Sequence, residues 1–219
     1  ENKSRLAAEY ISKYNYQVVV CQDGELAQSL INFTPDLVIN DILDTDSEFI
    51  EELKKSVPTV VNFEDLGSGM QNADLVFNAL YPNELPYDHV KVGHAYFCLR
   101  DEFIFTEPKE FRTRIKEVLI TFGGVDEGNL TKRVVSLLSN LAERMSIKLT
   151  VVTGPGYQHR ATLSRFDKKS HVEFIHTTSR ISDYMSRADV AITSGGRTVL
   201  ELAAMKVPTI VVCQNKRET

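Results

Sequence analysis

A Ser-Gly-Gly turn, residues 194–196, lies between two short apolar runs near the end of the sequence. The runs are residues 190–193 and 209–213, and residues 197–206 between them have the composition of a compact helix. Two apolar runs joined by a helix predict a βαβ crossover with both strands buried. Because glycine has no Cβ atom, Gly195 and Gly196 let backbone amides approach a ligand closely, which suits a phosphate group.

Two polar residues in the following helix, Thr198 and Glu201, admit two interpretations. Glu201 lies close enough to the mouth of the turn to accept hydrogen bonds from sugar hydroxyls. Alternatively, Thr198-x-x-Glu201 is a capping box in which the carboxylate reaches back to a backbone amide. From the pattern alone, the glycines could also simply end a strand.

A second glycine pair, Gly123 and Gly124, follows the apolar run 117–122. If both turns face one pocket, their amides and one acidic residue for ribose suit a nucleoside diphosphate. A P-loop needs a lysine and a serine or threonine directly after its glycines, and neither turn has them. The dinucleotide fingerprint G-x-G-x-x-G is also absent. We therefore predict a nucleotide site made by Gly123, Gly124, Ser194, Gly195, Gly196, Thr198 and Glu201.

The composition is that of an ordinary globular protein, with 42% hydrophobic and 25% charged residues among 219. A formal net charge of -5 argues against a general nucleic-acid binder. No apolar run reaches the roughly 20 residues of a membrane helix, and the first residues lack a signal-peptide core. Cys21, Cys98 and Cys213 lie far apart in apolar surroundings, so we expect small core residues, no disulfide and no metal site. These features predict a cytoplasmic protein.

The chain alternates apolar strands with helices in both halves, which predicts α/β architecture with parallel sheets and right-handed crossovers. In the first half the expected strands are 17–21, 37–40, 59–63 and 75–78, with helices at 1–14, around 24–31 and at 47–55. In the second half the expected strands are 117–122, 149–153, 172–175, 190–193 and 209–213. The polar stretch 106–109 contains a proline, so we predict domains at 1–105 and 106–219, with 100–109 as a connector.

The helix after the first strand of the second half has the clearest periodicity. Its apolar stripe comprises Leu130, Val134, Leu137, Leu138, Leu141 and Met145. Asn129 directly precedes this stripe and is the expected N-cap.

Four carboxylates of the first half follow predicted strands, where ligands of open α/β sheets collect. They are Asp41, Asp44, Glu64 and Asp65. We expect them to bind sugar hydroxyls or orient water, with Asp41 and Asp65 as the candidate catalytic residues. The alternative is that they are solvated loop carboxylates. None of the five histidines has a recognisable partner, so no catalytic base is assigned among them.

Several segments resemble one family of sugar-nucleotide enzymes. The pattern Thr193, Gly195, Gly196, Thr198, Glu201, Leu202 is similar to that family's nucleotide-binding motif, and residues 118–131 and 93–103 resemble two further signatures. Residues 38–45 and 60–67 also resemble its first-domain segments. The family has the GT-B fold and includes the pseudaminic-acid-pathway UDP-sugar hydrolase and spore-coat polysaccharide glycosyltransferase-like proteins.

The resemblance implies two Rossmann-like domains, with nucleotide held mainly by the second and sugar by the first. It also implies a UDP-sugar ligand, a sugar side that includes Gln214 and Asn215, no cofactor, and a role as hydrolase or glycosyltransferase in cell-surface glycan synthesis. The family's N-terminal Gly-x-Gly-His loop is absent. We therefore expect the first domain to lack its first βα unit and the second to be truncated, leaving a chain that binds UDP without turning over a UDP-sugar.

Two alternatives remain open, a sugar-nucleotide epimerase on the same fold and a non-catalytic domain attached to a sugar nucleotidylyltransferase. Expected partners are the nucleotide-sugar, a second copy of the chain, or an acylneuraminate-type nucleotidylyltransferase.

Overall fold

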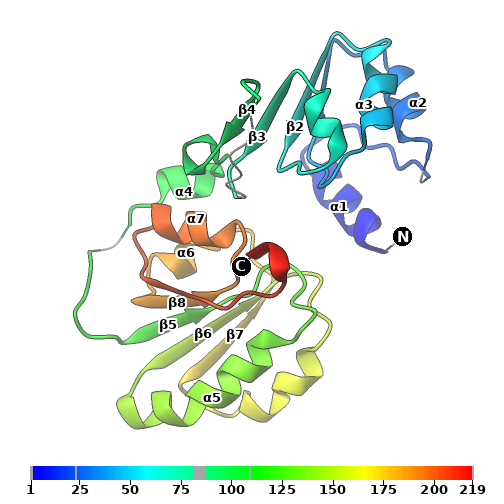
Figure 1. Ribbon diagram of the computed structural model, residues 1–219. Coiled ribbons are helices and arrows are strands. Elements are labelled where there is room, and N and C mark those ends of the chain that lie inside the picture. The colour runs from blue at the N-terminus through cyan, green and yellow to red at the C-terminus, as the bar shows by residue number, and fades with distance from the viewer. Residues whose placement is uncertain (1, 23, 81–86, 109, 219) are drawn as a thin grey trace. The chain divides into compact units, whose positions relative to one another are not determined.

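The computed structural model describes residues 2–22, 24–80, 87–108 and 110–218 (Figure 1). The chain forms two compact units, Glu1–Phe97 and Cys98–Thr219, each built on one parallel sheet with helices against it. The predicted fold class, α/β with two Rossmann-like domains, is confirmed. The division after Phe97 lies before the predicted boundary at 105–106.

The first unit has a four-stranded sheet in the order β1-β2-β3-β4. Its strands are β1 (Leu37–Asn40), β2 (Thr59–Phe63), β3 (Leu75–Asn78) and β4 (Val90–Val92). Its helices are α1 (Asn2–Ser12), α2 (Leu26–Ile31) and α3 (Ser47–Lys54), with short 3-10 turns η1 (Ser68–Gln71) and η2 (His94–Tyr96). Alternate residues of β1 to β3 point to the core, where α3 packs on them through Ile50 and Leu53.

The predicted strand at 17–21 does not form. This segment has no regular structure, and Val19 and Val20 are 55% and 64% exposed. A strand is stable only when its backbone groups pair with a neighbour. Among the described residues no strand pairs with this segment, and β1 is the edge of the sheet. The outward side chains of β1, Leu37 and Ile39, are correspondingly exposed.

The second unit has a five-stranded parallel sheet in the order β7-β6-β5-β8-β9. Its strands are β5 (Glu117–Ile120), β6 (Lys148–Thr153), β7 (Val172–His176), β8 (Val190–Thr193) and β9 (Thr209–Val211). Its helices are α4 (Asp101–Phe105), α5 (Leu130–Met145), α6 (Ser182–Met185) and α7 (Thr198–Ala204), with 3-10 turns η3 (Arg160–Phe166) and η4 (Lys216–Glu218). Strand order runs outward in both directions from the β5/β8 pair.

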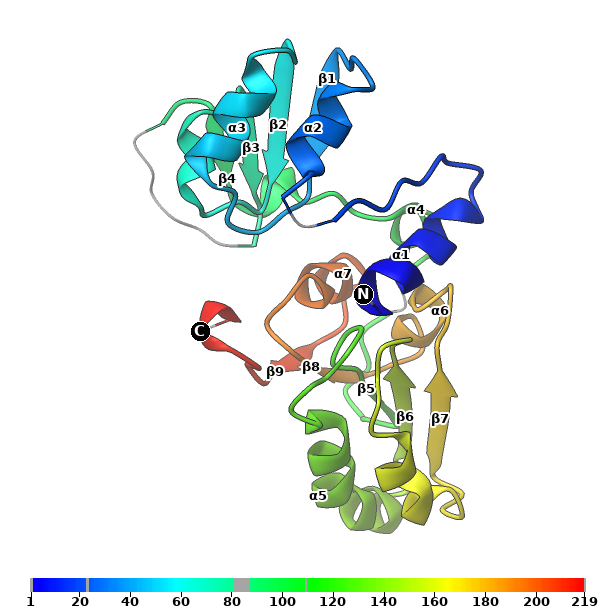
Figure 2. The ribbon, with the colours of Figure 1, turned by 90° about the vertical axis from the view of Figure 1, so that its right-hand side faces the viewer.

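The two faces of this sheet are covered by different helices (Figure 2). On one face α5 and η3 pack against Val118, Ile120 and Val151. On the other face α6 and α7 bury Met185 and Leu202 against Leu119. Because side chains alternate along a strand, β5 contributes to both cores and is the centre of the unit.

Helix α5 forms as predicted, but its buried stripe differs from the predicted one. Leu137, Leu141 and Met145 are 78%, 43% and 57% exposed, whereas Ser139 and Ala142 are buried. Small side chains let the helix axis approach the sheet closely, so the contact face contains serine and alanine, and three larger apolar residues face outward. The prediction from apolar residues alone was therefore wrong for part of the buried face.

Two further expectations are corrected. Segment 100–105 is not a connector, since Phe103 of α4 is 4% exposed in the core of the second unit. The cysteines are not core residues, because Cys98 and Cys213 are exposed and Cys21 is only partly buried. None of the helices in the described residues has the length and apolar content of a membrane-spanning segment.

Candidate functional site

The two glycine turns lie side by side at the carboxyl edge of the second unit's sheet. Gly123 and Gly124 follow β5, while Gly195 and Gly196 follow β8, and these two strands pair in parallel with Ile120 opposite Ile192. The strand order reverses at this pair, and open α/β sheets bind ligands in the crevice at such a point. The topology therefore brings together two turns that are about 70 residues apart in sequence.

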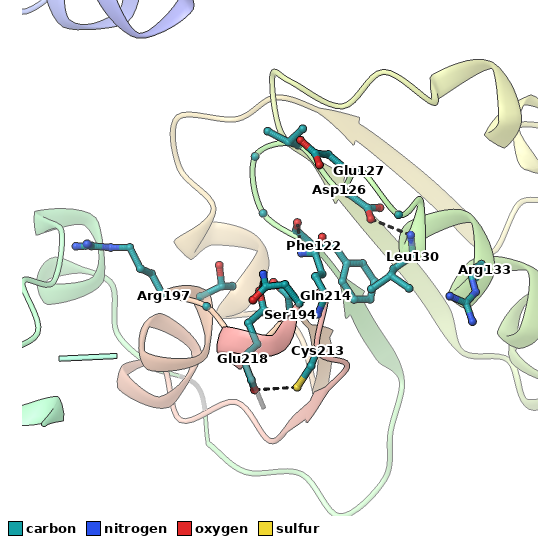
Figure 3. Close-up of a pocket in the computed structure, with 17 residues that line it drawn as sticks. Phe122, Asp126, Glu127, Leu130, Arg133, Ser194, Arg197, Cys213, Gln214 and Glu218 are labelled. Carbon is teal, nitrogen blue, oxygen red and sulfur yellow. Dashed lines mark hydrogen bonds between the residues drawn. The ribbon is translucent and has the colours of Figure 1, made fainter. Parts of the chain in front are cut away.

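A cavity of about 690 Å³ opens between these turns (Figure 3). Its walls include five of the residues predicted to bind nucleotide, namely Gly123, Gly124, Ser194, Gly196 and Thr198. Gln214 and Asn215, predicted for the sugar side, line the same cavity. The Gln214 side chain donates a hydrogen bond to the Phe122 carbonyl across the pocket.

Two arginines that sequence reasoning did not select, Arg133 and Arg197, also line this cavity. Both side chains are largely exposed, Arg133 from the first turn of α5 and Arg197 from the residue after the second glycine pair. Figure 3 shows them on opposite sides of the pocket. A guanidinium is a strong partner for phosphate oxygens. Arg197 directly follows a glycine turn, and this position is the sequence feature that could have identified it.

Two amides at the start of α5 are already satisfied by Asp126, which is 4% exposed. Its carboxylate accepts hydrogen bonds from Leu130 N (2.8 Å) and Thr131 N (2.9 Å). Asn129 occupies the predicted N-cap position, but the capping bonds come from Asp126. The Asn129 side chain makes no capping bond, and its amide oxygen accepts a hydrogen bond from the Tyr157 hydroxyl. The amides of Leu130 and Thr131 are therefore already bonded within the chain, although Leu130 lines the pocket.

The first turn is shaped by two glycines in different ways. Gly123 has φ +75°, a left-handed conformation that other residues adopt at a cost. Gly154, after β6, lies directly against this turn, and a Cβ atom there would be 2.4 Å from Gly124 Cα. Because Gly154 has no side chain, the turn at Gly123 and Gly124 can pack against β6 and leave space for the cavity.

The second turn already binds an anion of the chain itself. Oε2 of Glu218 accepts hydrogen bonds from Gly195 N (2.9 Å) and Gln214 N (2.7 Å). Glu218 also lines the cavity, and its backbone carbonyl accepts a hydrogen bond from the Cys213 thiol (Figure 3). Two converging amides that hold a carboxylate have the chemistry of a site for a phosphate oxygen.

Glu201 lies in an adjoining cavity of about 300 Å³, which shares Gly123, Gly124 and Thr198 with the larger one. Its side chain is 12% exposed and forms an ion pair with Arg100, with 3.2 Å between Oε1 and Nη2. The capping-box alternative is not realised, because no side-chain cap occurs at the start of α7. Burial raises the pKa of the Glu201 carboxyl, and the charge and hydrogen bond of Arg100 act in the opposite direction.

In the first unit, Asp65 is completely buried and its carboxylate is surrounded by donors. Oδ1 accepts hydrogen bonds from Thr45 N and Gly67 N, both at 2.9 Å. Oδ2 accepts from the Thr45 hydroxyl (2.5 Å) and from Asn62 Nδ2 (2.6 Å). A carboxylate with these contacts ties the loop after β1 to the loop after β2, and the proposed catalytic role of Asp65 has no exposed oxygen to support it.

Glu64 is also buried, with φ +55°, and its carboxylate accepts hydrogen bonds from Ala79 N and Leu80 N. Asp41 and Asp44, in contrast, are exposed, and Asp44 lines a cavity of about 500 Å³ in the first unit. The four predicted sugar-side acids thus fall into a buried pair that bonds to backbone amides and an exposed pair at the sheet edge. Within the described residues, no histidine lines either of the two cavities beside the glycine turns.

Comparison with known proteins points to one class of fold. Residues 118–218 match the sequence model of the glycosyltransferase family 28 C-terminal domain. An uncharacterised protein from Methanocaldococcus jannaschii, MJ1062, is 28% identical over 94% of the chain and 46% of its own length.

Two crystal structures share the fold. MurG from Acinetobacter baumannii matches with a TM-score of 0.55 and 17% identity over 92% of this chain and 63% of its own. The UDP-GlcNAc 2-epimerase of M. jannaschii, in complex with UDP-GlcNAc and UDP, matches with a TM-score of 0.54 and 14% identity over 88% of this chain and 64% of its own.

The chain spans less than two thirds of the length of these relatives. The two crystal structures show a shared two-domain α/β fold, and the family 28 match covers most of the second unit. The matched range begins in β5 and extends through η4, so it contains both glycine turns and the residues of the larger cavity.

Proposed function

We propose that the second unit binds a UDP-sugar and is the donor-binding part of a glycosyltransferase. The observation that carries this proposal is the pair of glycine turns at the β5/β8 switch point, with a carboxylate seated on the Gly195 amide. In the proposed complex the diphosphate contacts the amides of Gly124, Gly195 and Gly196, with Arg133 and Arg197 supplying positive charge.

The adjoining smaller cavity suits the nucleoside in this proposal. Glu201 lies on its wall with a nearly buried carboxylate, and a carboxylate of this kind accepts hydrogen bonds from ribose hydroxyls. Thr198, Gly123 and Gly124 line both cavities, so one ligand can extend from one to the other. The choice of uracil as the base is supported by the epimerase of the same fold, which was crystallised with UDP.

Calorimetric titration of the protein with UDP, CMP and uridine tests the proposal. UDP should bind, and uridine should bind more weakly because it lacks the phosphates that the glycine turns receive. Glu201→Ala should weaken UDP binding by about 1.5 to 3 kcal/mol, the loss of a hydrogen bond to a charged group. Glu173→Ala, which removes an exposed acid of β7 paired with Lys148, is the matched control. Equal affinities for UDP and uridine would contradict the phosphate assignment.

The finer assignment is also a proposal. The sequence signatures described above favour the group that contains the pseudaminic-acid-pathway hydrolase and the spore-coat glycosyltransferase-like proteins, and the family 28 match favours a glycan acceptor over water. Asp41, Asp44, Gln214 and Asn215 are proposed for the sugar side. Incubating the protein with a panel of UDP-sugars, and detecting free sugar, transferred sugar or a C2 epimer, separates hydrolase, transferase and epimerase. UDP binding with none of these products would favour the alternative of a binding domain associated with a nucleotidylyltransferase.

A further inference from the structure

The segment 99–103, Leu-Arg-Asp-Glu-Phe, carries a network of charged contacts that the proposed function does not yet use. Arg100 lies at its centre, with Nη1 2.7 Å from Oε1 of Glu102 and Nη2 3.2 Å from Oε1 of Glu201. Its guanidinium also lies over the Phe103 ring, 5.0 Å from the centroid. Phe103 is buried in the core of the second unit. The arginine is therefore held from three sides, and one of them is the proposed ribose-binding carboxylate.

The network is anchored at its other end by the backbone of α6. Oε2 of Glu102 accepts a hydrogen bond from Ser182 N (3.0 Å), and Ser182 is fully buried. Glu102 is 12% exposed, as is Glu201, whereas Arg100 is 53% exposed. Two nearly buried carboxylates thus share one arginine, which separates their charges. Without this arginine the two acids would face each other across a largely desolvated space.

The contact also determines which part of Glu201 remains for a ligand. Arg100 binds Oε1, while among the described residues no hydrogen bond is made to Oε2. Both side chains line the smaller cavity. A carboxylate fixed through one oxygen presents the other in a defined direction and loses little rotamer freedom when a ligand binds.

We propose that Arg100 is a positioning residue that orients Glu201 toward the ribose hydroxyls of the nucleotide, and that Glu102 holds Arg100 in place. This inference rests on the proposed function, because it needs a ribose in the smaller cavity. Arg100 acts through Glu201 and does not itself read the ligand. Arg100 should therefore increase the preference for ribose over deoxyribose without changing the affinity for phosphate.

The test compares the dissociation constants of UDP and 2′-deoxy-UDP by calorimetry. The quantity measured is the ratio of the deoxy constant to the ribo constant. In the unchanged protein this ratio should be about tenfold or more, as expected for a lost hydrogen bond to a charged group. Arg100→Ala should lower the ratio at least about threefold. Arg100→Lys should restore part of it, because the ammonium keeps the positive charge but cannot bond to two carboxylates through separate nitrogens as the guanidinium does.

The double variant Arg100→Ala/Glu201→Ala should give the same ratio as Glu201→Ala alone. Arg165→Ala is the matched control, because Arg165 also covers a phenylalanine ring, at 4.6 Å, and bonds to one side chain far along the sequence. It should leave the ratio unchanged. Because Arg100 is half exposed, the variants should fold, and Arg100→Gln replaces Arg100→Ala if the latter does not.

An unchanged ratio in Arg100→Ala overturns the inference, and so does an equal weakening of both nucleotides, which would mean a direct phosphate contact. A further fall of the ratio in the double variant below that of Glu201→Ala also overturns it. These results differ from failure of the proposed function, in which the unchanged protein binds no UDP at all.

Discussion

Replacing Asp65 by asparagine should destabilise the first unit strongly. The substitution keeps the size of the side chain and the oxygen that accepts from Thr45 N and Gly67 N. It places an amide NH₂ where Oδ2 now accepts from Asn62 Nδ2 and the Thr45 hydroxyl. The hydroxyl can rotate to accept, but the Asn62 amide cannot turn over without losing the hydrogen bond that its Oδ1 accepts from Asn40.

The cost follows from these contacts. One buried donor without a partner costs about 1–3 kcal/mol, and the loss of charge on the remaining acceptor weakens two further bonds by up to about 1 kcal/mol each. The expected destabilisation of Asp65→Asn is therefore about 2–4 kcal/mol. With a urea dependence of roughly 2 kcal/mol per molar, the unfolding midpoint of this unit should fall by about 1–2 M.

Hydrogen exchange measured by mass spectrometry at increasing urea reads the two units separately. Peptides from β1 to β3 should lose protection at lower urea, while peptides from β5 and β6 should not change. Asp41→Asn, an exposed acid at the end of β1, is the matched control and should change stability by less than about 0.5 kcal/mol. If Asp65→Asn left the β1 to β3 peptides as protected as before but abolished reaction with a UDP-sugar, the structural role would be refuted and the catalytic one supported.

Three further outcomes are expected. Gly154→Ala should displace the turn after β5 and weaken UDP binding by about 1–3 kcal/mol in calorimetry, whereas Gly156→Ala, whose added Cβ would lie 3.1 Å from Gly124 O, should weaken it less; equal effects would refute the packing argument. Asp126→Ala should lower the urea midpoint of the second unit by the equivalent of about 2 kcal/mol, because two amides at the start of α5 lose their acceptor; unchanged exchange in α5 would contradict this. Burial alone would raise the pKa of Asp74, but hydrogen bonds from Lys54 and the backbone lower it below 3.8 overall. Its contribution to stability is therefore present above about pH 4 and lost as pH falls through the lowered pKa, so Asp74→Asn should flatten the loss of stability below pH 4 in urea titrations.

The element order could be predicted because apolar periodicity and glycine or proline punctuation agree along most of the chain. The strands 37–40, 59–63, 75–78 and 190–193 form as predicted. The segment 17–21 has the same local pattern and fails, because pairing depends on a neighbour that is not encoded locally. The prediction of the buried face of α5 was wrong for a related reason. The helix lies close to the sheet, so small residues such as Ser139 and Ala142 occupy the contact face.

The glycine turns of the larger cavity were predictable, because a glycine pair after a strand lets backbone amides approach a ligand, whereas Arg133 and Arg197 were not predicted. The placement of Glu201 near the turn followed from helical spacing, but its partner did not, since Arg100 is separated from it by 101 positions. Glu64 and Asp65 look alike in sequence to Asp41 and Asp44. Only the packing of the loops shows that the first two are buried against backbone amides and the last two are exposed.

The carboxylate of Glu218 on the Gly195 amide would make the proposed nucleotide binding an exchange reaction. A diphosphate oxygen that takes this amide replaces an anion of the protein and not water, so the measured affinity is a difference between two similar interactions. If a phosphate binds at Gly195 as proposed, the Glu218 carboxylate competes for the same amide when the phosphate leaves.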